Sequence, residues 1–240
     1  MARVLIAAVF VPSPPLLVPE LNGLAADETD ELRAAALTAV SEIADCADWT
    51  VVGTGPAPAR VTPTASGSFR GYGADVRAEL GPEATGDADP GLPLPALIAG
   101  WLRDRVAPAV RADVHVVPAD AARDECTALG RRLRAGLDEG ETPRGLLVIA
   151  DGAATLTAKA PGAFDARAEA VETDLTAALA AGDPPALTSL DPERCAEIVL
   201  DGRAAWQVLA GAFGAAPSAV KIAYSGAPYG VGYHVGTWRP

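Results

Sequence analysis

Six short apolar runs recur along the chain and alternate with segments of helical periodicity. The runs lack the strict alternation of a half-exposed strand, which is typical of strands that are covered on both faces. Such strands belong to mostly parallel sheets with helices on either side. We predict strands at Val4–Val11, Trp49–Val52, Val114–Val117, Gly145–Ala150, Val220–Tyr224 and Val231–Val235.

The intervening segments carry the start and stop signals of helices. Asp165 is placed to cap a helix over residues 166–181 that ends at Gly182, and Pro192 follows Asp191 at the start of a short helix. The pattern predicts a single α/β domain over residues 1–240, with a mostly parallel central sheet flanked by helices. The other helices are expected from Leu32 to Ile43 after the acidic pair Asp27-Glu28, from Ala122 to Leu137, and from Arg203 to Phe213.

Charge and composition narrow the function classes. With 19 basic and 31 acidic residues the net charge is −12, and this charge repels nucleic acid and anionic membranes. The apolar start is too short to span a bilayer and runs into Pro12, so we expect a first strand and a cytoplasmic protein. The three cysteines are far apart in segments of helical periodicity, which favours buried thiols over a disulfide or zinc site.

Two connections are unusual for this architecture. Residues 53–92 are rich in Gly, Pro, Ser and Thr and are far longer than the usual link of roughly 4–6 residues, so this segment is either a functional flap or partly disordered. Asp151 to Phe164 directly follows a predicted buried strand. Loops that leave the carboxyl ends of such strands are where α/β proteins place their ligands.

Four segments together resemble a known superfamily. They are Val11–Glu20 with its Pro-Ser-Pro-Pro run, Val51–Pro56 with Gly-Thr-Gly-Pro, Asp151–Gly162 ending in Ala-Pro-Gly, and Ala227–Tyr233 with Pro-Tyr-Gly-Val-Gly. In this order and spacing the chain resembles the class III extradiol ring-cleavage dioxygenases, of the protocatechuate 4,5-dioxygenase β-subunit type that includes the Memo-like proteins. The resemblance implies an α/β fold with a pocket in which two histidines and a carboxylate hold Fe(II), and a further histidine acts as acid and base.

The positions that the resemblance assigns to this chemistry carry other residues. The two iron-binding histidines are expected at Ser13 and at Ala57 to Ala59, and the acid/base histidine is expected at Ala154. The carboxylate is expected at Ser225 to Ala227, around Gly226. Hydroxyl and methyl groups do not replace the imidazole and carboxylate ligands of ferrous iron, so the resemblance points to a branch that lacks the iron ligands.

Three residues remain candidates for catalysis, and a purely structural role is the alternative to be weighed against it. Asp151 ends a strand and suits either a pocket or a turn carboxylate. His234 follows the Gly-Val-Gly-Tyr run and suits a general acid or base, whereas His115 is expected to be a hydrogen-bonded core residue. Ser13 is held extended among prolines and suits a ligand contact or, with a nearby base, a nucleophile.

Further candidates for ligand binding lie in the same loops: Thr54, Thr155, Lys159, Ser225 and Tyr229. The structural alternative for Lys159 is a solvated surface ammonium, and that for Tyr229 is an aromatic ring that packs its loop down. If the loops form one site, Ser13, Asp151, Ser225 and Tyr229 should converge on one cavity.

Three functions follow as hypotheses. The first is a dioxygenase-like protein with a degenerate iron site that needs no cofactor and binds a small molecule or catalyses a metal-independent reaction. The second is an active Fe(II)-dependent ring-cleavage dioxygenase whose ligands lie elsewhere in the chain. The third is a non-catalytic interaction protein, for example a homodimer that uses the apolar last helix and Trp206 as its surface.

Overall fold

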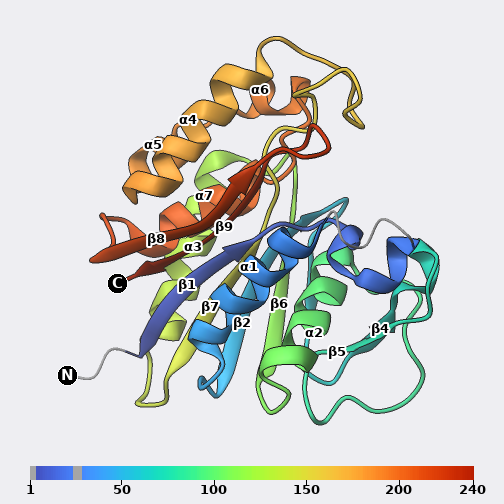
Figure 1. Cartoon of the computed structure of the whole chain (residues 1–240). Coiled ribbons are helices and arrows are strands. Elements are labelled where there is room, and N and C mark those ends of the chain that lie inside the picture. The colour runs from blue at the N-terminus through green and yellow to red at the C-terminus, as the bar shows by residue number, and fades with distance from the viewer. Residues whose placement is uncertain (1–3, 24–28) are drawn as a thin grey trace.

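The computed structural model describes residues 4–23 and 29–240, and its centre is a seven-stranded sheet (Figure 1). The strand order is β3-β6-β2-β7-β1-β9-β8. The neighbours β6, β2, β7 and β1 run parallel, and antiparallel strands flank them on both sides, which confirms the predicted α/β sheet. The strands are β1 (Leu5–Val11), β2 (Asp48–Gly55), β3 (Ala59–Val61), β6 (Arg111–Pro118), β7 (Arg144–Ile149), β8 (Ala219–Gly226) and β9 (Tyr233–Arg239).

Helices cover both faces of the sheet, so successive strand residues enter two different cores (Figure 1). Val9 and Leu147 face the core under α1 and α2, whereas Phe10 and Val148 face the core under α3, α4 and α7. The two short helices α5 and α6 connect α4 to α7. The helices are α1 (Asp30–Val40), α2 (Leu94–Val106), α3 (Arg123–Leu137), α4 (Ala168–Ala181), α5 (Pro184–Thr188), α6 (Pro192–Glu197) and α7 (Arg203–Phe213).

α3 and α7 approach each other closely because each presents a glycine to the other. A Cβ atom on Gly130 would lie 2.1 Å from the carbonyl oxygen of Val208, and one on Gly211 would lie 2.3 Å from that of Thr127. α7 is buried between α3 and the sheet, and Trp206 is 0% exposed. The expectation that Trp206 offers an association surface is therefore wrong, because its ring packs edge-on against Phe10 inside the core.

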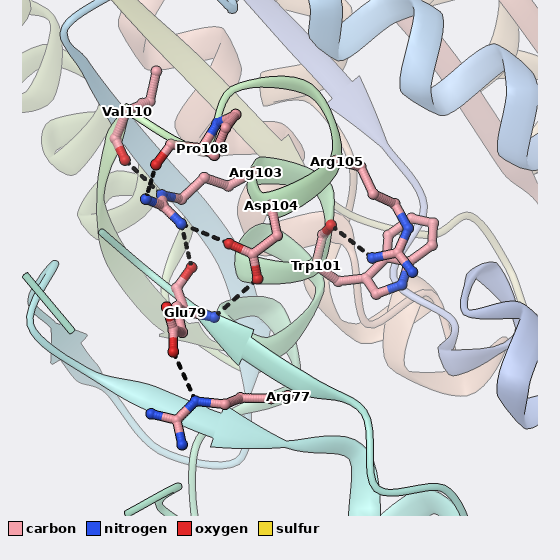
Figure 2. Close-up of polar contacts among 8 residues, drawn as sticks. All are labelled: Arg77, Glu79, Trp101, Arg103, Asp104, Arg105, Pro108 and Val110. Atoms are coloured by element: carbon pink, nitrogen blue, oxygen red, sulfur yellow. Dashed lines mark hydrogen bonds and ion pairs between the residues drawn. The ribbon is translucent and has the colours of Figure 1, made fainter. Parts of the chain in front are cut away.

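The long segment after β2 is folded. β3 joins the edge of the central sheet, while β4 (Ser66–Ser68) and β5 (Arg77–Glu79) pair with each other around a short 3-10 helix, Phe69–Tyr72. The buried Arg103 of α2 holds this unit in place, because its guanidinium donates to the carbonyl oxygens of Val110 and Glu79 (Figure 2). The segment between β2 and α2 thus forms an ordered wall, that is, a folded unit packed beside the sheet.

Several expected elements differ from the structure. β8 has no buried residue, because it is the edge strand of the sheet, although its sequence suggested a covered one. Asp165 does not cap α4: its carboxylate accepts from the amide and guanidinium of Arg167. The acidic pair Asp27-Glu28 lies outside the described residues. No helix in the described part of the chain is long and apolar enough to cross a membrane.

Candidate ligand-binding site

A cavity of about 430 Å³ lies at the carboxyl ends of the parallel strands. Because these strands run in one direction, the loops that follow them meet at one edge of the sheet. Ser13 follows β1, Thr54 and Pro56 come from the end of β2, Ala119 follows β6 and Asp151 follows β7. The remaining lining residues are Gly55, Gly152, Ala154, Val199, Asp201, Gly202 and Val231.

Asp151 is the best-anchored polar group of this cavity. Its Oδ1 accepts a hydrogen bond from the backbone amide of Ser13 at 2.8 Å, and its Oδ2 accepts one from the Ser13 hydroxyl at 2.5 Å. Its carbonyl oxygen accepts from the indole nitrogen of Trp206 at 3.1 Å. Gly202 is required beside it, because a Cβ atom there would lie 2.1 Å from that carbonyl oxygen.

The environment of Asp151 raises the pKa of its carboxyl group to about 6. Burial is the largest cause, since it disfavours the charged carboxylate, and the negative charge of Glu172 acts in the same direction. The hydrogen bonds from Ser13 and the nearby His234 lower the pKa and so oppose these effects. The carboxyl group therefore changes protonation close to neutral pH, as a general acid or base requires.

His234 lies behind the cavity and is 2% exposed. Its Nε2 lies 2.7 Å from Oε1 of Glu172, and its Nδ1 lies 3.1 Å from the hydroxyl of Ser225, its neighbour across β8 and β9. The other oxygen of Glu172 accepts from the amide of Ala153 at 2.8 Å. The pair thus ties α4 and β9 to the loop that carries Asp151.

Glu172 is the residue that the sequence reasoning missed. In α4 it stands four residues after Ala168 and three before Leu175, on the stripe that faces the core. A carboxylate on an otherwise apolar stripe is a signal that a buried partner exists. Val171, Leu175 and Leu179 form an apolar stripe in the same helix, and this stripe conceals the signal from Glu172.

The other predicted ligand-binding residues are dispersed. Thr54 lines the cavity, whereas Thr155 is buried and donates to the carbonyl oxygen of Ile198 at 3.1 Å. Lys159 is exposed, and Tyr229 packs against the core on the α1 side. Ser225 is exposed on β8 and contacts His234. Of the four residues expected to converge on one cavity, Ser13 and Asp151 do so, and Ser225 and Tyr229 do not.

The donor groups around the cavity do not fit ferrous iron. Ser13 and Ala154 line it at two positions where the resemblance expects histidines, and Pro56 lines it just before Ala57. The oxygen donors are the hydroxyls of Ser13 and Thr54 and the carboxylates of Asp151 and Asp201, with no imidazole among them. Across residues 4–23 and 29–240, no group of three or more His, Cys, Asp or Glu is arranged to hold a metal ion.

Comparison with known proteins shows what the fold resembles. No protein-family model matches the sequence, and no curated protein is significantly similar to it. The fold is similar to the crystal structure of uncharacterized protein JW3007 from Escherichia coli K12, with a TM-score of 0.57 and 13% sequence identity. The match covers 98% of this chain and 100% of that chain. At this identity the likeness concerns the fold, so the chain is a single-domain α/β protein with the architecture of JW3007.

Proposed function

We propose that this chain is an extradiol dioxygenase-like protein that binds a small molecule in the Asp151 cavity and acts on it without iron. Asp151 is the group that accepts or returns a proton, and Ser13 positions its carboxylate. The observation that carries the proposal is the pair of hydrogen bonds from Ser13 that hold Asp151 at the cavity wall, where its pKa is raised to about 6.

The size and place of the cavity support a small-molecule ligand. About 430 Å³ lies within the range of small-molecule sites, roughly 300–1,000 Å³, and ligands of open α/β sheets bind beyond the carboxyl ends of the strands. A carboxyl group whose pKa is near neutral exchanges a proton at little cost in free energy. Asp151 therefore combines a ligand contact with acid and base chemistry.

The buried pair of His234 and Glu172 lies outside the cavity and stabilises the loop that carries Asp151. Glu172 fixes the amide of Ala153, two residues after Asp151, and its charge contributes to the raised pKa of that carboxyl group. In this proposal both are positioning residues, because neither lines the cavity.

Fragment screening by NMR tests the proposal. Isotope-labelled protein, dialysed against a chelator, is titrated with small organic fragments while the backbone amide signals are followed. Saturable shifts should cluster at Ser13, Gly152 and Gly202, and Ala154→Phe, which fills the cavity, should abolish them. Asp174→Asn, on the exposed side of α4, is the matched control and should leave the shifts intact. Shifts that cluster elsewhere, or that persist in Ala154→Phe, contradict the proposal.

Iron loading separates this proposal from Fe(II)-dependent ring cleavage. Protein incubated anaerobically with Fe(II) and then desalted should retain far less than one iron per chain, because the cavity offers hydroxyls and carboxylates without imidazole. Near-stoichiometric iron that is lost in Asp151→Asn supports the iron-dependent alternative.

A further inference from the structure

A second hollow of about 640 Å³ borders the Asp151 cavity. The two share Thr54, Gly55 and Pro56, which form the end of β2 and the residue after it. The second hollow lies between this strand end and the wall built by the segment before α2. A molecule that reaches from one to the other would have to pass Pro56, which lines both.

The two compartments differ in charge. The Asp151 cavity is lined by two carboxylates, Asp151 and Asp201, and its described lining contains no basic side chain. The second hollow is lined by no charged residue of the described chain. Its surface comes from proline rings, leucines and one tyrosine, namely Pro90, Leu92, Pro93, Leu94, Leu97 and Tyr72.

Tyr72 is the one aromatic residue that lines the apolar compartment in the described part of the chain. It is 46% exposed, although its ring centroid lies 6.1 Å from that of the fully buried Phe69. A partly exposed aromatic ring is suited to pack against a planar ligand.

Resting on the function proposed above, we propose that the ligand is an organic cation, with an ammonium group beside Asp151 and an apolar or aromatic tail that runs past Pro56 to Tyr72. Ser13 uses two of the roughly four acceptor positions of the Asp151 carboxylate, so the others remain for the N–H donors of an ammonium group. Thr54 lines both compartments, and its side chain carries a further acceptor oxygen. Asp201 at the exposed rim adds negative charge along the path of entry.

Isothermal titration calorimetry at pH 7.5 tests this inference with two probes of matched shape, 4-phenylbutylamine and 4-phenylbutan-1-ol, and with butylamine, which lacks the phenyl tail. The phenyl amine should bind about tenfold more tightly than the alcohol, because a charge-assisted hydrogen bond replaces a neutral one. Asp151→Asn should remove this preference, while Asp174→Asn should retain it. Lowering the pH through about 6 should weaken the binding of the amine, because Asp151 becomes protonated. The affinity for the alcohol should not change.

Tyr72→Ala tests the proposed contact with the tail. It should lower the affinity for 4-phenylbutylamine several-fold and leave the affinity for butylamine unchanged. Circular dichroism establishes that each variant is folded. The inference is overturned if the alcohol binds as tightly as the amine, if the preference survives in Asp151→Asn, or if no probe binds. When the alcohol alone shifts the Ser13 and Gly152 amides, the proposed function stands and the cation inference fails. When neither these probes nor any fragment shifts those amides, both fail.

Discussion

The imidazole of His234 and the carboxylate of Glu172 meet at 2.7 Å directly behind the loop that carries Asp151. Both side chains are largely removed from water, with 3% and 12% of their surface exposed. A buried partner of this kind is costly to remove, because the group left behind loses its hydrogen bond without regaining water.

Glu172→Ala should lower the free energy of unfolding by about 3 kcal/mol, because it leaves His234 and the amide of Ala153 without their acceptor. Glu172→Gln retains an oxygen for that amide and should cost about 1 kcal/mol or less. Denaturant titration measures both variants. Equal losses for the two substitutions contradict this role of the carboxylate.

Ser13→Ala should raise the pKa of Asp151 above about 6, because the Ser13 hydroxyl stabilises the ionised carboxylate. Carbon-13 NMR of the carboxyl group measures the titration directly. Thr54→Val removes another hydroxyl of the cavity wall and serves as the control, with an unchanged midpoint expected. A midpoint that stays fixed or falls in Ser13→Ala shows that the hydroxyl does not stabilise the charge.

Asp151→Asn should stabilise the fold above pH 6. The folded pKa of Asp151 is raised from 3.8 to about 6, so the native state binds more protons than the unfolded state between these values. The contribution of Asp151 to stability therefore falls as the pH rises through this window. At pH 7.5 the variant should gain about 3 kcal/mol in unfolding free energy, and at pH 3.5 it should gain almost nothing. A gain that is independent of pH contradicts the linkage.

Gly130→Ala should destabilise the protein by about 2 kcal/mol or more, because the new Cβ atom would lie 2.1 Å from the carbonyl oxygen of Val208. Gly136→Ala, in the same helix with no atom within 4 Å of its added Cβ, is the matched control. Alanine has a higher helix propensity than glycine, so the control substitution should be neutral or stabilising by about 0.5 kcal/mol. Thermal unfolding measures the pair, and similar shifts would show that α3 and α7 do not need the close approach.

Local signals in the sequence predicted much of the fold. The helix over Arg203–Phe213 has the predicted ends, Asp191 caps α6 through the amide of Arg194, and Gly182 ends α4 with a left-handed φ of 62°. These features depend on a few adjacent residues. α2 was missed because its residues from Pro95 to Arg103 are all buried, which removes the helical periodicity.

The sequence predicts only those site residues that end a strand or follow one. Ser13, Thr54 and Asp151 follow or end parallel strands, so the sequence alone placed them near one another. Asp201 and Gly202 approach the cavity from the start of α7, and Glu172 approaches its rear from α4. Those contacts depend on how helices pack on the sheet, which no local pattern encodes.

The titration of Asp151 with and without a bound fragment tests the central claim most directly. In the free protein the carbon-13 signal of its carboxyl group should titrate near pH 6, and a saturating fragment that shifts the Ser13 and Gly152 amides should displace this midpoint. A midpoint near 3.8 in the free protein, or one that the bound fragment leaves unchanged, would contradict the assignment of Asp151 as the proton-accepting group of the cavity.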